Sequence, residues 1–304
     1  MKRFILILAP VAVVVLLCAT PSTSGAILYQ IQKDVELYGN LDQDDIAGGG
    51  EVDCGPVAAV NSFVYLENKY PDVYDRHLVP DIEDPPDNVR DYNELINAAV
   101  LVSTAAYMNT KAPGGTWDDM FIYGKYNYIE MQVRGVTIYA AQMLGMWGFP
   151  GNPPNVRPPD EIPPIPKPTW VADLMYPTWD FIFNELYHCE DVEILINWAG
   201  GGHYLTLTGF TFDDADGDGV INPDEGENAV IYYIDPATGT TGHSNIWNVE
   251  VTSPYGQYEL MTNYESGAIV TMAVSESPIP EPATIAMIAS GLMGLVAVAR
   301  RKLH

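Results

Sequence analysis

The sequence DCGPVAAVNSFVYLEN, at residues 53–68, predicts the helix around which the rest of the fold is arranged. Its valines recur at helical spacing, and Pro56 lies in the first turn, where a missing backbone N–H is tolerated. The stretch places Cys54 at the helix N-terminus, where partial positive charge and free N–H groups favour a thiolate and an oxyanion. Gly55 leaves room for a substrate to approach the backbone. Cys54 is therefore a candidate catalytic nucleophile.

The other expected elements fall into two groups along the chain. Further helices are expected at 93–108, 136–147 and 179–187, and the proline-rich stretch 150–168 is expected to form an extended surface loop. From residue 192 onward, β-branched and aromatic residues predominate. Strands are expected there at 193–198, 203–212, 229–234, 247–251 and 268–274. Helices first and an antiparallel sheet second predict an α+β fold.

Two polar residues in the predicted sheet suit the roles of base and orienting acid. His203 opens the apolar strand YLTLTGF after two glycines, and Asp235 ends the later strand IYYI. If these strands are hairpin neighbours, a carboxylate at the end of one reaches a histidine at the start of the other. A cysteine nucleophile requires such a base, held in place by a third group. The sequence therefore predicts a Cys54–His203–Asp235 triad.

Three motifs in chain order, DCGPVAAVNSF, GGHYLTLTGF and YYIDPATG, resemble the bacteriocin-processing (double-glycine) peptidase-like family, also called peptidase C-thirty-nine-like. The stretch GGTWDDMFIYGKYNYI is similar to the middle region of that family, so the resemblance covers roughly residues 43–239. It implies a papain-like cysteine peptidase fold, with Cys54 as nucleophile, His203 as base and Asp235 as orienting acid. His203 follows Cys54 by 149 residues, close to the interval of about 130–150 in papain-type chains.

The resemblance is incomplete at the oxyanion hole. The family usually carries a glutamine about six residues before the cysteine, but Gly48 stands at that position here, within the glycine run 48–50. Gln43 is the alternative oxyanion donor if the glycine run forms a longer loop. The missing glutamine also keeps open the alternative that the fold is retained without catalysis.

The cysteines leave one further alternative. Cys18 lies in the N-terminal apolar run, so the body holds Cys54 and Cys189. A disulfide between these two is an ordinary outcome in an exported protein and would silence Cys54. Cys189 stands at a helix-to-strand junction, which favours a structural role for it.

Residues 214–225, DADGDGVINPDE, satisfy the calcium-loop pattern D-x-[DN]-x-[DN]-G-x5-E without a gap. Strands flank the loop, so an EF-hand-like loop is expected rather than a full EF-hand, and an acidic surface turn is the alternative. Because the loop connects the strands of His203 and Asp235, calcium is expected to support the alignment of that pair. The expected ligands are the side chains of Asp214, Asp216, Asp218, Asn222 and Glu225 and the carbonyl of Val220.

Both ends of the chain carry targeting patterns. Residues 1–26 have a basic start, an apolar run and a small-residue exit, which predict a cleaved secretory signal peptide. In the segment 278–304, Pro280, Glu281 and Pro282 precede an apolar run and a basic end. This order resembles the PEP-CTERM sorting signal. It implies recognition by an exosortase, a helix transiently held in the membrane, and delivery to the cell envelope or extracellular matrix.

Composition narrows the function of the body, residues 27–275, which is expected to form one domain. The chain has 14 basic and 40 acidic residues and a net charge of -26. Such a surface repels nucleic acid, so no nucleic-acid partner is expected. The first hypothesis is an exported, calcium-stabilised cysteine peptidase-like hydrolase that acts on peptide or protein substrates. The alternative is a non-catalytic calcium-binding cell-surface or extracellular-matrix protein.

Overall fold

The computed structural model describes residues 27–46, 52–82, 90–111, 114–147, 166–218, 220–222 and 224–279. Several of the predicted features lie outside these residues: the signal peptide at 1–26, the glycine run at 48–50, most of the proline-rich stretch, Gly219, and the sorting motif of Pro280, Glu281 and Pro282 with its apolar run.

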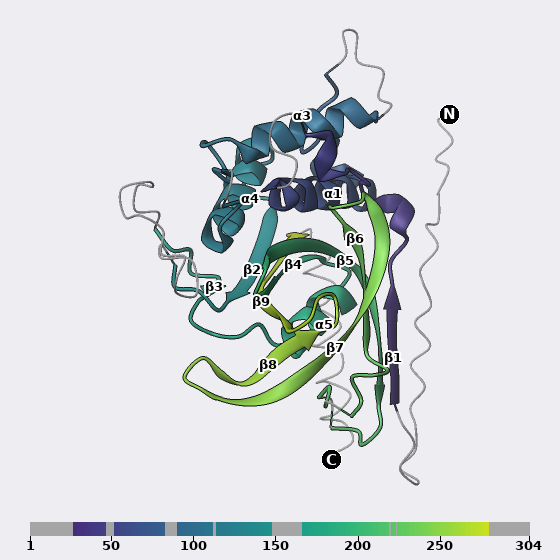
Figure 1. Cartoon of the computed structure of the whole chain (residues 1–304). Coiled ribbons are helices and arrows are strands. Elements are labelled where there is room, and N and C mark those ends of the chain that lie inside the picture. The colour runs from purple at the N-terminus through teal and green to yellow at the C-terminus, as the bar shows by residue number, and fades with distance from the viewer. Residues whose placement is uncertain are drawn as a thin grey trace, which may run out of the picture.

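A nine-stranded sheet organises the described part of the chain (Figure 1). Its strands follow the order β1-β5-β6-β7-β8-β9-β2-β3, and β4 pairs with both β5 and β9, so that β4 to β9 form a closed circuit of hydrogen-bonded neighbours. The pairing is antiparallel except between β2 and β3. The bounds are β1 (Ile27–Gln32), β2 (Thr137–Met143), β3 (Val171–Ala172), β4 (Asp191–Trp198), β5 (Gly201–Asp214), β6 (Val230–Asp235), β7 (Thr240–Ser253), β8 (Gly256–Thr262) and β9 (Ala268–Pro278).

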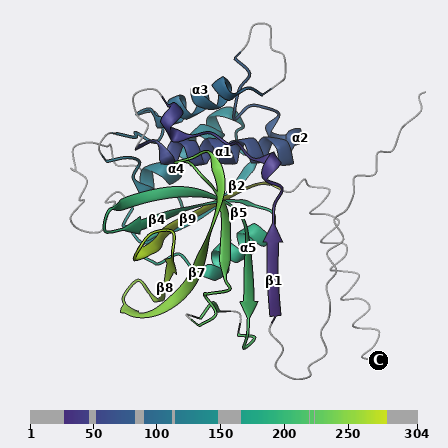
Figure 2. The same cartoon turned by 45° about the vertical axis from the view of Figure 1, so that its right-hand side comes forward.

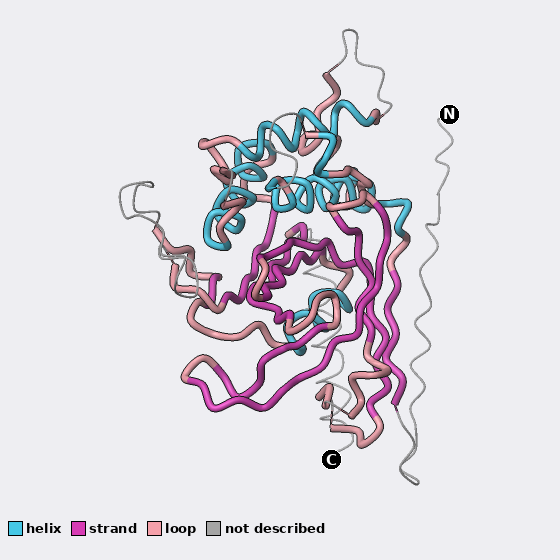
Figure 3. The backbone as a smooth tube through the Cα atoms, in the orientation of Figure 1, coloured by secondary structure: helices cyan, strands magenta, loops and turns pink. Residues whose placement is uncertain are grey.

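Most helices gather at one end of the curved strands (Figure 3). They are α1 (Cys54–Lys69), α2 (Pro71–Tyr74), α3 (Tyr92–Ser103) and α4 (Asp118–Gln132), whereas α5 (Trp179–Tyr187) packs against β4 and β5 (Figure 2). Two short 3-10 helices, η1 (Val35–Leu37) and η2 (Gln43–Asp45), precede α1. Helix α1 is buried from Cys54 to Glu67, because it lies between the strands β4 and β5 and the helix α3. It is the central helix that its sequence predicts.

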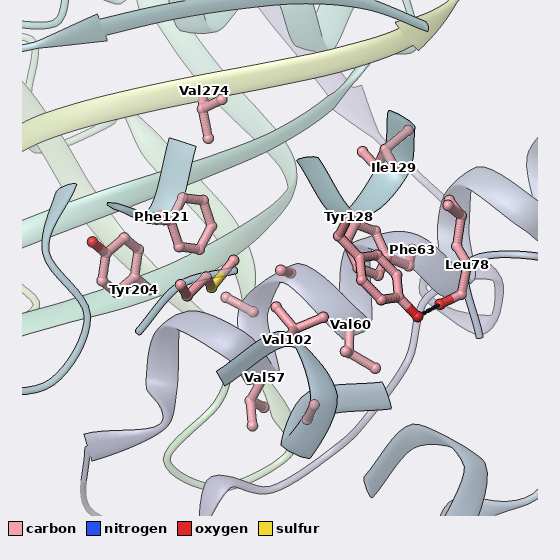
Figure 4. Close-up of a cluster of buried hydrophobic side chains, with 14 of the residues drawn as sticks. Val57, Val60, Phe63, Leu78, Val102, Phe121, Tyr128, Ile129, Tyr204 and Val274 are labelled. Atoms are coloured by element: carbon pink, nitrogen blue, oxygen red, sulfur yellow. Dashed lines mark hydrogen bonds between the residues drawn. The ribbon is translucent and has the colours of Figure 1, made fainter. Parts of the chain in front are cut away.

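The core of the helical side surrounds α1 (Figure 4). Val57 and Phe63 are fully buried there, and the ring of Phe63 stacks on Tyr128 of α4 at a centroid distance of 5.2 Å. The Tyr128 hydroxyl donates to the carbonyl of Leu78 over 2.8 Å, which satisfies its polar atom inside the core. A second core, between α5 and the strands, contains Trp179 and Phe210. Each side of the sheet thus has its own apolar layer.

The α+β, papain-like fold predicted from the sequence, with N-terminal helices followed by an antiparallel sheet, is wrong. Strands hold more of the described residues than helices do, β1 precedes the first helix, and β2 and β3 lie between α4 and α5. The helix expected at 136–147 is instead β2, whose buried residues alternate along the strand and which pairs with β9. The buried residues of this segment therefore recur every two residues, as in a strand, and not every 3.6 residues, as in a helix.

Other predicted elements are confirmed within a few residues. The helices at 54–68 and 179–187 are α1 and α5, and the helix at 93–108 is α3, which ends earlier, at Ser103. The five predicted strands lie in β4, β5, β6, β7 and β9, although β7 begins seven residues before the predicted start at 247. None of the helices in the described ranges is both long enough and apolar enough to cross a membrane.

Candidate active site

Cys54 is the first residue of α1 and lies at its N-terminus. The first helical hydrogen bond joins the Val57 N–H to the Asp53 carbonyl over 3.0 Å, so the N–H of Cys54 is not used by the helix. Cys54 is 7% exposed. Gly55 is required here, because a Cβ at this position would lie 2.8 Å from the hydroxyl oxygen of Thr116. The missing side chain lets the segment before α4 approach the helix start.

His203 and Asp235 meet at one end of the β5–β6 pair. The strands are antiparallel, with Thr206 opposite Ile234, so the start of β5 faces the end of β6. His203 Nε2 lies 2.7 Å from Asp235 Oδ1, and the side chain of Cys54 lies near enough to the imidazole to raise its pKa. Because Nε2 is engaged by the carboxylate, Nδ1 is the ring nitrogen left for the thiol. The structure brings together all three residues of the predicted triad.

The carboxylate of Asp235 is fixed by further donors. The Ala237 N–H donates to Oδ1 over 2.9 Å, and the Tyr264 hydroxyl donates to Oδ2 over 2.9 Å. The turn that follows closes on Gly239, which has a φ of 61°. A Cβ there would lie 2.7 Å from the Asn40 carbonyl oxygen, so glycine serves both the left-handed backbone and the close approach.

The charges of the site support one another. Burial alone would lower the pKa of His203, but its hydrogen bond to Asp235 and its interactions with Cys54 outweigh burial and raise that pKa to about 9. Burial alone would raise the pKa of Asp235, but the hydrogen bond and the charge of His203, with the other donors, hold it below its usual range. The arrangement thus favours an imidazolium between a carboxylate and a thiol.

Gln43, the predicted oxyanion donor, lies beside this site. It is in η2, and its N–H donates to the carbonyl of Pro236 over 2.8 Å, directly after Asp235. Its side chain is buried, and its Oε1 has no hydrogen-bond partner among the described residues. Gln43 therefore lies next to the candidate site, and its role as the oxyanion donor stays a prediction.

Tyr264 is the residue of this site that sequence reasoning missed. It lies between β8 and β9, in the segment NYESG, and its ring stacks near the imidazole of His203 at a centroid distance of 5.7 Å. A single tyrosine between two strands has no distinguishing spacing. The one clue to it is that the second carboxylate oxygen of Asp235, the predicted orienting acid, needs a hydrogen-bond donor. That clue can be used only once the positions of the strands are known.

Cys189 does not pair with Cys54 in the structure, where both cysteines are free. Cys189 is exposed and has a φ of 65°, at the turn between α5 and β4. Its carbonyl accepts a hydrogen bond of 2.8 Å from the Tyr65 hydroxyl of α1. This contact ties the turn to the central helix, which accords with a structural position.

The predicted calcium loop joins β5 to β6 at the end of the strands away from α1 (Figure 2). Carboxylate oxygens of Asp214, Asp216 and Asp218 lie within 4.8 Å of one another. Glu225 closes the turn, since its two oxygens accept from the N–H groups of Ala215 and Asn222 over 2.8 and 3.0 Å. Val220 lies in the same turn and donates its N–H to Asp218 over 2.7 Å.

Comparison with known proteins identifies the C-terminal segment. Residues 278–302 match the PEP-CTERM protein-sorting motif. The chain therefore carries a sorting signal, which implies export, membrane anchoring through the C-terminus and recognition by an exosortase-type processing enzyme. No peptidase family model matches the body. A search of curated proteins finds no match to the chain.

Proposed function

We propose that the body is a cysteine hydrolase of amide bonds, a peptidase acting on peptide or protein substrates. The observation that carries this proposal is the imidazole of His203, which is hydrogen-bonded to Asp235 and interacts with the side chain of Cys54. A buried histidine that only fills space does not need both a thiol and a carboxylate beside it. This pair of contacts is what nucleophile activation requires.

The reaction follows from the positions of these groups. The thiolate of Cys54 attacks the substrate carbonyl, a C–S bond forms, and negative charge develops on the carbonyl oxygen. The free N–H of Cys54 lies at a helix N-terminus and is suited to stabilise that oxygen, with the amide of Gln43 as a second donor. His203 then gives its proton to the leaving amine as the C–N bond breaks. Water, deprotonated by His203, hydrolyses the thioester and restores the thiol.

The direct test is turnover of a broad fluorogenic peptide library by the mature protein, with and without a thiol alkylator. We expect hydrolysis that the alkylator abolishes, with the label on Cys54 in peptide mass spectrometry. Cys189→Ser is the matched control, because Cys189 is exposed and outside the site; this variant should keep full activity and full sensitivity to the alkylator. Hydrolysis that survives complete labelling of Cys54 would contradict the proposal.

A non-catalytic surface or matrix protein is the second candidate, and one feature favours it. Gly48 stands where the resembled family usually has its oxyanion glutamine. Without that donor, electrostatic stabilisation of the tetrahedral intermediate is weaker. This candidate predicts no hydrolysis of any library peptide, and slow labelling of Cys54 by an electrophilic probe at near-neutral pH.

Calcium is the cofactor that we propose for the loop at 214–225. Three convergent carboxylates and a fourth from Glu225 fit a hard divalent cation, which takes oxygen ligands and offsets their mutual repulsion. Asp214 is fully buried, whereas Asp216 and Asp218 face solvent, so an ion would enter from outside. Affinities of about 10⁻⁴–10⁻³ M are usual for extracellular modules, which suits an exported chain.

Removal of calcium is expected to lower the melting temperature by roughly 5–10 °C. At a calcium concentration about 100 times the dissociation constant, binding stabilises the native state by about 2.7 kcal/mol, and each kcal/mol shifts the melting temperature of a domain this size by about 2–4 °C. Differential scanning calorimetry in EGTA and in calcium measures the shift. Asp216→Asn should lose most of it, and Asp224→Asn, an exposed loop residue outside the ligand set, should retain it.

The loop lies far from the catalytic pair, and this determines how calcium affects activity. Ten residues of β5 separate His203 from Asp214, a distance of about 35 Å along an extended strand. Local hydrogen bonds align the pair at the other end of the hairpin. Activity should therefore fall on chelation only as the protein unfolds, and not through the alignment of His203 and Asp235 that the sequence led us to expect from calcium. An equal melting temperature with and without calcium would mean that the loop is an acidic surface turn.

The sorting signal defines where this activity would be located. We propose processing by an exosortase near Pro280, Glu281 and Pro282, followed by delivery to the cell envelope or extracellular matrix. Strand β9 ends at Pro278, directly before the motif, so cleavage there would leave the sheet intact. Mass spectrometry of the mature protein would locate both processed ends.

A further inference from the structure

Tyr264 links the two strands of the catalytic pair to a third part of the chain. It lies between β8 and β9, half-buried, whereas His203 opens β5 and Asp235 ends β6. Its ring plane is inclined by 21° to the imidazole of His203, in a stacked arrangement. Its hydroxyl reaches past the imidazole to Asp235 Oδ2, at 2.9 Å. One side chain thus contacts both partners of the pair.

Because Tyr264 donates to it, the carboxylate of Asp235 accepts hydrogen bonds on both of its oxygens. Oδ1 accepts from His203 Nε2 and from the Ala237 N–H, and Oδ2 accepts from the Tyr264 hydroxyl. A carboxylate with donors on one oxygen alone turns about its terminal bond, since that torsion is broad. A donor on the second oxygen fixes the plane, and the plane sets the geometry of the hydrogen bond to His203.

The groups around Tyr264 make its hydroxyl the donor. The titratable groups that face it are Asp235 and Tyr233 from β6, His203 from β5 and Cys54 from α1. Burial, followed by the charge of Asp235, raises the pKa of Tyr264 above its usual range, so the phenol keeps its proton. The Trp198 ring also lies near Tyr264, at a centroid distance of 6.2 Å.

We propose that Tyr264 is a positioning residue for the proposed hydrolase: its hydroxyl fixes the carboxylate plane of Asp235, and its ring covers the imidazole of His203. The hydrogen bond between Asp235 and His203 then points along the direction that keeps the imidazolium facing Cys54. The kinetic consequence rests on the proposed function. The effect on His203 itself does not, because it is present in the resting protein.

Tyr264→Phe tests the hydroxyl and leaves the ring in place. Without the donor on Oδ2, the Asp235–His203 hydrogen bond weakens, and the pKa of His203 should fall by about one unit. Titration of the ¹³C-labelled imidazole by NMR measures this shift, with the resonance assigned by comparison with His203→Ala. In peptide hydrolysis, kcat should fall about tenfold with KM unchanged, because substrate contacts are intact.

Tyr233→Phe is the matched control. It removes a neighbouring phenol whose hydroxyl bonds to Ser244 at 2.9 Å and not to Asp235. The pKa of His203 should therefore stay unchanged, and kcat should stay within twofold of the wild-type value. An unchanged or raised pKa of His203 in Tyr264→Phe overturns the proposal, as does a fall in melting temperature with no change in the titration. If wild type hydrolyses no peptide while the NMR shift appears, the hydrolase proposal fails and the positioning role stands.

Discussion

Replacement of His203 by alanine is expected to lower peptide hydrolysis by about 10²–10⁴, the usual contribution of a positioned general acid–base group. In the described structure, His203 interacts with the side chain of Cys54 and is hydrogen-bonded to the carboxylate of Asp235. Its loss removes the imidazolium that balances the thiolate and the proton that the leaving amine requires. Initial rates with a cleaved library peptide measure the effect.

Alkylation of Cys54 gives a second readout that needs no substrate. Electrophilic probes react with the thiolate and not with the thiol. Because His203 is the group that would take the proton of Cys54, alkylation at pH 6 should be about tenfold slower in His203→Ala than in the wild type.

An exposed histidine provides the control for both measurements. His243 lies on β7 with its side chain facing solvent, and its ring packs only loosely on Tyr232, at a centroid distance of 6.2 Å. His243→Ala should leave hydrolysis and the alkylation rate unchanged. If His203→Ala is alkylated as fast as the wild type, the imidazole does not activate the thiol, and Cys54 is activated by the helix alone or not at all.

The three residues of the candidate site were predictable because each carries a local signal. Cys54 precedes Gly-Pro at a helix start, His203 follows two glycines before an apolar strand, and Asp235 ends a strand before a turn. Hairpin pairing of β5 and β6 then brings the last two together, as antiparallel neighbours must. Tyr264 has no such signal, because its partner lies 29 residues away across two strands.

The fold was less predictable, and two segments show why. The apolar residues of segment 136–147 fit the period of a helix as well as that of a strand. The segment forms a strand because it pairs with β9, so tertiary contacts decide its structure. Helix α4 carries Gly124 and many aromatic residues, which are poor local signals for a helix. A Cβ at Gly124 would lie 2.6 Å from the backbone N of Met108, so packing against that segment explains the glycine.

Helix α4 also carries a fully buried charge of the described core. Lys125 Nζ is fully buried; it lies 3.4 Å from Asp191 Oδ2 and makes shorter contacts with Glu193 and Glu276. These carboxylates come from β4 and β9, so the cluster ties α4 to the sheet. Burial lowers the pKa of Lys125, but the three carboxylates outweigh it and raise that pKa. Burial raises the pKa of Glu193, despite the opposing charge of Lys125.

Lys125→Met is expected to reduce the free energy of unfolding by about 3–5 kcal/mol at pH 7.5, because it leaves buried carboxylates without their cation. Those carboxylates then remain buried only when protonated, so the folded state binds more protons than the unfolded state. Stability should therefore fall as pH rises above about 4.5, where unfolded glutamates ionise. The loss at pH 5 should be smaller than at pH 7.5. Urea denaturation followed by fluorescence at both pH values measures the difference.

Two variants make this result specific to the cluster. Lys69→Met removes an exposed lysine at the end of α1 and should change stability by less than about 0.5 kcal/mol. The double variant Lys125→Met/Glu193→Gln should recover part of the loss at pH 7.5, since one carboxylate no longer requires a proton, and its dependence on pH should be flatter. If Lys125→Met instead loses the same free energy of unfolding at pH 5 and at pH 7.5, the loss comes from packing. The three carboxylates are then neutral whether or not the ammonium is present.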